Sequence, residues 1–225
     1  MNNKIYLADG NELHMSELSG KLEGFWSLST SVWENEFCKL RQLIEGSICS
    51  ECYAASSRWR NQLKAPLGRN LNILNSKTYK VEEFPYIPLK VMRLESHGDI
   101  SNLNHAINYI RLAKRNPHCT FTLWTKNHAT LDRAIRMEGK PKNLICGISS
   151  LYKNKPSEKY YNWTDFIFTV YTADYVNEKG IEINCPRKCA NCMKCYKTEN
   201  FKRKSKPVMI SEILKNDARK VNVPE

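Results

Sequence analysis

The sequence predicts an α/β protein with mainly parallel strands, followed by a C-terminal cysteine-rich segment that binds a metal or cluster. Two observations support this prediction. Short apolar segments alternate with amphipathic ones between residues 89 and 171, and four cysteines fall within residues 185–195. Strand, helix and strand in succession imply βαβ units and a parallel sheet. We therefore expect a main domain over residues 1–184 and a metal-binding segment with a basic tail over residues 185–225.

The first ninety residues hold short elements. Lys4–Leu7 and Phe25–Ser29 read as strands, because they are apolar and are bounded by turn residues. A helix is expected from Tyr53 to about Leu63. Residues 64–86 read as a connection with an exposed helix that ends at Pro85.

The regular region follows. Strands are predicted at residues 89–94, 120–124, 144–149 and 166–171, and helices at residues 101–115 and 131–137. The lysine-rich tail then carries a short amphipathic helix, indicated by the helical spacing of Ile210, Ile213 and Leu214.

The C-terminal cysteines are the sharpest chemical signal. Cys185, Cys189, Cys192 and Cys195 have the spacing C-x3-C-x2-C-x2-C, which is too tight for ordinary disulfides. All four thiolates can instead turn onto one metal centre. Zinc sites usually split into two separated pairs, whereas an unbroken run is typical of iron–sulfur ligation. We expect a 4Fe-4S cluster here, with zinc as the alternative.

A second cysteine group lies near the N-terminus. Cys49 and Cys52 form a C-x2-C pair at the start of the predicted helix, and Cys38 lies upstream. A helix N-terminus favours the thiolate form of a cysteine. A cluster held by only three thiolates leaves one iron open to a small molecule. The alternative is that Cys38 is a core thiol and the pair completes another site. Cys119 and Cys146, in apolar stretches, are expected to be core residues.

Polar residues follow successive predicted strands. Glu95, His97 and Asp99 come after one strand, Lys126 after the next and Ser149 after the third. The carboxyl ends of parallel strands meet at one edge of the sheet, where α/β proteins bind ligands. We therefore expect a pocket at this edge, although each residue alone could be a loop or capping residue.

Composition points to a basic protein. The 225 residues include 35 Lys and Arg against 23 Asp and Glu, a net charge of +12. Such a surface favours polyanions, so nucleic acid is a possible partner, although a solvated basic surface is the alternative. No long apolar run predicts a membrane span and no signal peptide is recognisable. The expected location is the cytoplasm, where free thiols stay reduced.

Several motifs together carry a family resemblance. They are Cys38, Cys49-x2-Cys52-Tyr53-Ala54, Gly98-Asp99, Trp124-Thr125-Lys126 and Cys189-x2-Cys192-x2-Cys195-Tyr196. Over roughly residues 25–196 the chain resembles the phage "gene product 88" family. More distantly, it is similar to phage proteins that resemble radical S-adenosylmethionine enzymes.

The resemblance implies a partial (β/α) barrel. It implies a 4Fe-4S cluster on Cys38, Cys49 and Cys52, whose open iron chelates S-adenosylmethionine, with Tyr53 beside it. The loop from Glu95 through His97 to Asp99 would meet the amino group of that cofactor, and Lys126 its carboxylate. The C-terminal cysteines would hold an auxiliary cluster.

The chemistry implied by the resemblance needs an electron, so a reductant protein is an implied partner, and a phage protein would act in the host cytoplasm. The sequence departs from the radical enzymes in one respect. Their C-x3-C-x2-C signature is absent at the N-terminal site and occurs only as Cys185, Cys189 and Cys192.

Three functions remain open from the sequence. The leading one is a radical S-adenosylmethionine-like enzyme that acts on a nucleic acid or nucleotide. The second is a non-catalytic iron–sulfur or zinc protein that binds nucleic acid or a host protein. The third is a redox or nuclease-like enzyme with structural clusters. The number of clusters and the state of the N-terminal one separate them.

Overall fold

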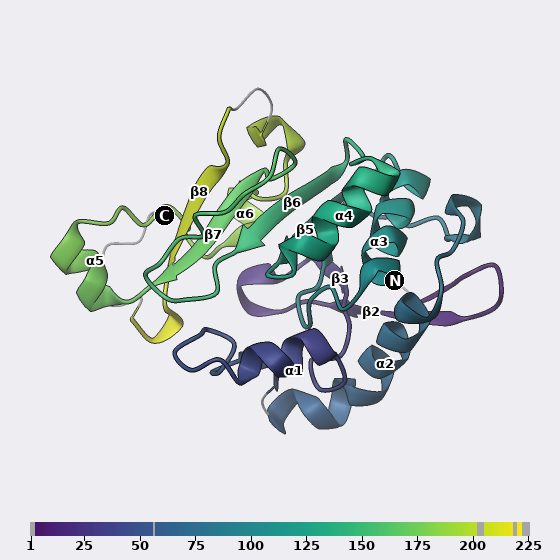
Figure 1. The fold of residues 1–225 in the computed structure, drawn as a ribbon, viewed down its shortest axis with the longest axis horizontal. Helices are drawn as coiled ribbons and strands as arrows, with labels where there is room; N and C mark the ends of the chain where they lie inside the picture. Colours follow the sequence, from purple (N-terminus) through teal and green to yellow (C-terminus); the bar gives the residue numbers. More distant parts are fainter. Residues whose placement is uncertain (1–2, 56, 202–204, 218–219, 222–225) are drawn as a thin grey trace.

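A single mixed sheet organises the molecule (Figure 1). The computed structural model describes residues 3–55, 57–201, 205–217 and 220–221. The strands, in both sequence and spatial order, are β1 (Lys4–Tyr6), β2 (Glu12–Glu17), β3 (Trp26–Leu28), β4 (Val91–Leu94), β5 (Thr120–Thr125), β6 (Leu144–Ser149), β7 (Phe166–Tyr171) and β8 (Val208–Ile213). The first three strands pair antiparallel, and β3 to β8 all pair parallel. The α/β class with a mostly parallel sheet is confirmed.

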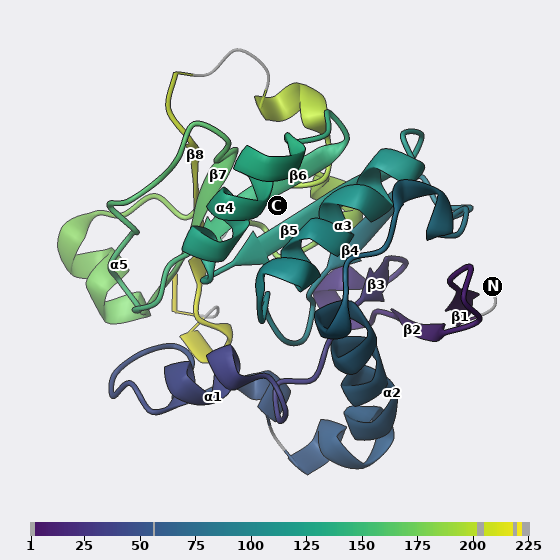
Figure 2. The ribbon, with the colours of Figure 1, turned by 45° about the vertical axis from the view of Figure 1, so that its right-hand side comes forward.

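Helices fill the connections between strands. They are α1 (Glu36–Gln42), α2 (Ser57–Ser76), α3 (Leu103–Arg115), α4 (His128–Glu138), α5 (Ala173–Lys179) and α6 (Cys189–Cys192). Figure 2 shows α3 and α4 together on one side of the sheet. Right-handed crossovers that step in one direction place their helices on the same face, which accounts for this arrangement.

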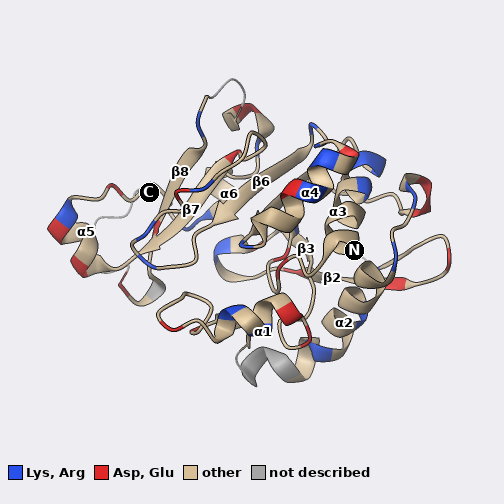
Figure 3. Cartoon of the chain, in the orientation of Figure 1, with Lys and Arg blue, Asp and Glu red and all other residues tan. Residues whose placement is uncertain are grey.

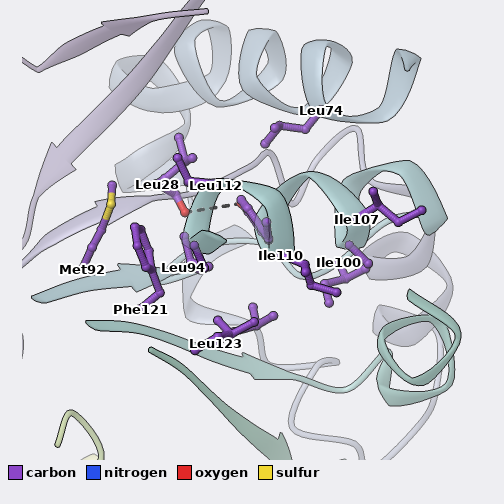
Figure 4. Close-up of a cluster of buried hydrophobic side chains, with 14 of the residues drawn as sticks. Leu28, Leu74, Met92, Leu94, Ile100, Ile107, Ile110, Leu112, Phe121 and Leu123 are labelled. Carbon is purple, nitrogen blue, oxygen red and sulfur yellow. Dashed lines mark hydrogen bonds between the residues drawn. The ribbon is translucent and has the colours of Figure 1, made fainter. Parts of the chain in front are cut away.

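The main core lies between α2, α3, α4 and that face of the sheet. Alternate strand residues point into it, among them Leu28, Leu94 and Phe121, all fully buried. Figure 4 shows these side chains facing Ile110 of α3, with Leu74 of α2 above them. Burial of a side chain of this size contributes about 1.5–3 kcal/mol, so this face supplies much of the stability of the fold.

The opposite face of the sheet is covered by the cysteine-rich segment. Ile145, Phe166 and Ile210 point to this side and pack with Cys195 and Tyr196. Gly147 lets the Phe166 ring lie directly against β6, because a Cβ at this position would be 2.1 Å from that ring. The C-terminal cysteines are therefore held against the sheet rather than on a separate lobe.

Most predicted elements are confirmed. The four predicted strands of the regular region correspond to β4, β5, β6 and β7, and the two predicted helices to α3 and α4. The strands predicted near residues 4–7 and 25–29 correspond to β1 and β3.

The predicted C-terminal helix is wrong. Ile210 and Ile213 belong to strand β8, which pairs with β7 in register from Phe166–Val208 to Tyr171–Ile213. Helical spacing in so short a stretch does not outweigh the backbone hydrogen bonds that the exposed edge of β7 offers.

The helix predicted from Tyr53 is also different. Tyr53–Ala55 forms a 3-10 turn, and α2 then runs from Ser57 to Ser76 through Pro66, where a connection was expected. Leu67, Leu71 and Leu74 are buried along it. Their burial outweighs the hydrogen bond that a proline removes from a helix.

Within the described residues, no helix is both long and apolar enough to cross a membrane. Lysine and arginine are spread over several elements, with α1 and α4 both carrying basic side chains (Figure 3). Of the basic tail, residues 202–204 lie outside the described part of the chain.

Candidate functional site

Cys38 lies in the first turn of α1. Figure 1 shows α1 beyond the carboxyl ends of the parallel strands. Asn35 caps this helix, because its side-chain oxygen accepts a hydrogen bond of 3.3 Å from the Cys38 backbone N–H. The Asn35 amide nitrogen also donates to the carbonyl oxygen of Asp99 at 2.6 Å. One fully buried side chain thus ties α1 to the loop after β4.

Cys49 and Cys52 lie in the turn that follows α1. The Cys52 N–H donates to the Cys49 carbonyl at 3.2 Å, and the neighbouring Ile48 N–H donates to Leu151 at 2.8 Å. The second bond fastens this turn to the loop between β6 and β7. The pair therefore does not open a long helix, as the sequence predicts, but lies in a tethered loop.

The three thiols share one neighbourhood. Burial raises the pKa of Cys38 far above its ordinary value, and the Asp99 and Glu95 carboxylates raise it further, as do Cys52 and Cys49. Burial also raises the pKa of Cys49, which Lys126 opposes. Cys38 and Cys49 are therefore protonated in the free protein, so binding of a metal as thiolate must release protons.

Lys126 stands at the end of β5. Its ammonium donates to the Ser149 hydroxyl at 3.0 Å, and its backbone N–H donates to Asp99 Oδ2 at 2.8 Å. Asp99 Oδ1 also accepts from the Thr125 hydroxyl. Burial raises the pKa of Asp99, although Lys126 opposes this shift. Asp99 therefore joins the loop after β4 to the end of β5 by hydrogen bonds.

The Glu95 carboxylate, like that of Asp99, has several hydrogen-bond partners. Its carboxylate accepts from Tyr109 at 2.6 Å and from the Thr30 hydroxyl at 2.9 Å, and His105 Nε2 lies 3.1 Å away. Its backbone has a positive φ of 55°, a conformation that a non-glycine residue adopts only at a cost. Gly98 makes room for it, because a Cβ there would lie 2.5 Å from Glu95 Oε2.

Tyr53 joins the cysteine turn to the same loop. Its hydroxyl donates to the Ser96 carbonyl at 2.6 Å, and its ring centroid lies 6.0 Å from that of His97. Burial lowers the pKa of His97, so its imidazole is neutral near pH 7. Tyr53 stays 66% exposed, which leaves an aromatic surface beside the thiols.

The donor set can be tested against a metal. Among the described residues, no three His, Cys, Asp or Glu side chains converge on one point as a single ion requires. The ligands of an iron–sulfur cluster need not meet at one point, because each thiolate binds a different iron. Cys38, Cys49 and Cys52, in one neighbourhood with Lys126, are the donor set that a cluster with one open iron would use.

The second cysteine group lies on the face of the sheet opposite the main core. The Cys185 N–H donates to Ser211 of β8 at 3.1 Å, and α6 spans Cys189–Cys192. Burial raises the pKa of Cys185 to about 11 and that of Cys195 to about 12. Cys192 is exposed, so the group is reachable from solvent.

A buried cation accompanies these four thiols. Arg93 of β4 is 8% exposed, with its guanidinium 3.9 Å from the centroid of Trp124 and its Nη1 3.3 Å from the Tyr196 hydroxyl. Arg93 Nε and Trp124 Nε1 have no hydrogen-bond partner among the described residues. Arg93 opposes the raised pKa values of Cys189 and Cys195. A thiolate-bound metal or cluster is anionic, so it fits this cation and these unused donors.

The residues expected at the N-terminal site thus come together, and those of the C-terminal group form a separate site. Sequence reasoning missed Asn35 and Arg93, and it used Trp124 only as part of a family motif. Asn35 had a signal, because it lies three residues before Cys38 at a capping position. Arg93 had none, since nothing in a β-strand shows which face a distant segment will cover.

A separate open cleft of about 390 Å³ lies between α2 and the first hairpin. Glu12, Glu34, Gly68, Arg69 and Asn72 are among its lining residues. Among the described residues, neither a cysteine nor Lys126 lines it. The cleft is therefore distinct from both groups of thiols.

The chain is similar to a described protein family. A family model described as Gene product 88 matches residues 7–195, a span that contains all seven candidate cysteines. The chain belongs to the gene product 88 family. No curated protein matched the chain, and neither did any solved structure.

Proposed function

We propose that this gene product 88 family member is an iron–sulfur protein of the radical S-adenosylmethionine kind, acting on a nucleic acid or nucleotide. The observation that carries the proposal is the gathering of Cys38, Cys49 and Cys52 beside Lys126, at the carboxyl ends of parallel strands. The sequential order of β3 to β8 supports the partial (β/α) barrel on which such a site is built.

In this proposal the three thiolates hold a 4Fe-4S cluster, which supplies an open iron for an amine and a carboxylate and an electron for bond cleavage. Lys126 neutralises the carboxylate of S-adenosylmethionine through a charge-assisted hydrogen bond. The loop at residues 95–99 borders its amino group, with Glu95 and Asp99 holding the loop in place. The side chains of Tyr53 and His97 line the proposed S-adenosylmethionine site.

The four C-terminal cysteines hold an auxiliary cluster in this proposal, or zinc as the alternative. Arg93 supplies a fixed positive charge beside them. The electron must come from a reductant protein, and the host cytoplasm is the expected setting, because it keeps the thiols reduced.

The second candidate is a non-catalytic iron–sulfur or zinc protein that binds nucleic acid or a host protein. The protein donors that already engage the carboxylates of Glu95 and Asp99 favour it, because those groups are then less available to a small ligand. The two candidates differ in whether the N-terminal cluster accepts a ligand.

Anaerobic reconstitution tests the proposal. Two 4Fe-4S clusters correspond to about eight iron and eight sulfide per chain. The electron-paramagnetic resonance spectrum of the reduced protein should change when S-adenosylmethionine is added, and 5′-deoxyadenosine should form slowly. Protein with both clusters and no spectral change at saturating S-adenosylmethionine would favour the second candidate.

A further inference from the structure

We propose that the strand-end edge around the three thiols binds single-stranded nucleic acid, through a mouth surface defined by Arg41, Tyr152, Lys155 and Lys159. This inference rests on the proposed function, because it names the substrate class of the same site. It goes further, however, since it assigns binding to a specific loop, residues 150–165 between β6 and β7.

The loop is held at the mouth of the site. The backbone of Tyr152 pairs antiparallel with Ser47 and with Lys155 in single β-bridges. The Ile48 N–H donates a hydrogen bond to the Leu151 carbonyl. Ser47 also donates through its hydroxyl to the Arg41 carbonyl at 3.2 Å. These contacts place the loop against the turn that carries Cys49 and against the end of α1.

The mouth surface itself carries three cations, and exposed acids in the same segments are Glu45, Glu51 and Glu158. The Lys159 ammonium lies 5.7 Å from the centroid of the Tyr161 ring, and the Tyr161 hydroxyl lies 3.2 Å from Nδ1 of His128 at the start of α4. The cations therefore lie on two segments at the mouth of the site, the last turn of α1 and the loop of residues 150–165. Glu51 is nearby but pairs with Lys153 at 2.8 Å.

The cations of the mouth surface are not neutralised within the protein. Among the described residues, none of Arg41, Lys155 and Lys159 forms an ion pair with a carboxylate. Arg41 lies instead over the Phe37 ring, at 4.9 Å. Unpaired cations on one edge attract a polyanion through release of its counterions.

The aromatic member sets the class of polyanion. Tyr152 is 40% exposed in the midst of these cations. Basic side chains that track a backbone, combined with an exposed aromatic ring on which a base stacks, are the usual elements of single-strand binding. A duplex keeps its bases stacked on each other, and an acidic peptide has no base to stack.

Two pairs of variants test this assignment by fluorescence anisotropy with a labelled oligonucleotide. Lys155→Gln/Lys159→Gln removes two cations from the mouth surface. The matched control, Lys90→Gln/Lys142→Gln, removes two exposed lysines that precede β4 and β6, at the opposite edge of the sheet. The mouth variant should flatten the plot of log affinity against log salt by about 1.4, since each single-strand phosphate contact contributes about 0.7. The control should leave the slope unchanged.

The aromatic pair is Tyr152→Ala against Tyr86→Ala, an exposed tyrosine that stacks on His118 before β4. Tyr152→Ala should weaken binding roughly 5- to 140-fold, the range that stacking of one base supports, with no loss towards an abasic strand. Tyr86→Ala should bind as the wild type does.

Two outcomes would overturn the proposal. One is equal effects from the mouth and control variants. The other is competition by polyglutamate of matched charge, together with no effect of Tyr152→Ala, which would indicate an acidic protein partner. Iron content and the spectral response to S-adenosylmethionine are measured on the same variants. If iron content and the spectral response are normal but the oligonucleotide does not bind, the nucleic-acid assignment is wrong and the enzyme proposal stands. If the oligonucleotide binds but the spectral response is absent, the enzyme proposal is wrong and the nucleic-acid assignment stands.

Discussion

The hydroxyl of Tyr53 donates a hydrogen bond of 2.6 Å to the carbonyl oxygen of Ser96. This contact spans 43 residues of sequence and joins the turn of Cys49 and Cys52 to the loop after β4. A cluster on that turn would therefore lie at a fixed position relative to the strand ends.

Tyr53→Phe removes this hydrogen bond and keeps the ring. The expected loss is about 1 kcal/mol in the free energy of unfolding, the net worth of one such bond. Guanidinium unfolding of the metal-free protein measures it. Tyr86→Phe is the control, because the Tyr86 hydroxyl bonds no group in the described part of the chain. Equal stability of the two variants would show that the contact is not formed in solution.

Lys126→Ala is expected to weaken S-adenosylmethionine binding about 10- to 100-fold, because a hydrogen bond to a charged group contributes about 1.5–3 kcal/mol. Iron content should stay at the wild-type level. Cys52→Ala, by contrast, should lose the N-terminal cluster. Lys142→Ala serves as the control for charge. The proposed role of Lys126 fails if its removal leaves the titration with S-adenosylmethionine unchanged.

Cys192→Ser tests whether the C-terminal cysteines hold a structural metal. A fully ligated site contributes on the order of 10 kcal/mol, so loss of one ligand should lower Tm by roughly 10 °C. The wild type and the variant should melt together after chelation. A metal-loaded variant with wild-type Tm and metal content would contradict a structural role.

Cys146→Ala should retain all the iron. Cys146 is fully buried in the main core, and burial raises the pKa of its thiol to about 12. Loss of one buried sulfur should cost about 1 kcal/mol of stability, which calorimetry can detect. Loss of one cluster's iron would instead make Cys146 a ligand.

Glu138 gives the stability a predictable dependence on pH. Its carboxylate lies 2.6 Å from Arg111 and 3.0 Å from Lys114, which together hold its pKa below the ordinary 4.5 against the opposing effect of burial. An acid with a lowered pKa in the folded state stabilises the fold above its unfolded pKa, and this contribution is lost as pH falls through the folded one.

Glu138→Gln should therefore be less stable than the wild type at pH 7, and the gap should close as pH falls below about 4.5. Urea unfolding at several pH values measures the gap. Glu45→Gln, at an exposed position without an ion pair in the described part of the chain, should show a small gap at every pH. A constant gap for Glu138→Gln would refute the coupling.

The sequence by itself determined the regular half of the fold. Residues 89–171 carry apolar periods long enough to identify β4 to β7, α3 and α4, and the cysteine spacings mark two candidate sites. Local patterns suffice there, because each amphipathic element needs only one buried face. The polar residues at the strand ends followed from the same logic.

Only the tertiary structure decided the rest. Residues 208–213 became strand β8, because the open edge of β7 offers backbone partners that helical spacing cannot supply. Asn35 and Tyr53 locate the three thiols through contacts 43 or more residues away. Arg93 met Tyr196 because the cysteine-rich segment folds onto the face of the sheet opposite the main core. These contacts join segments far apart in sequence, so their energy appears only once the chain has closed, and no local pattern records them.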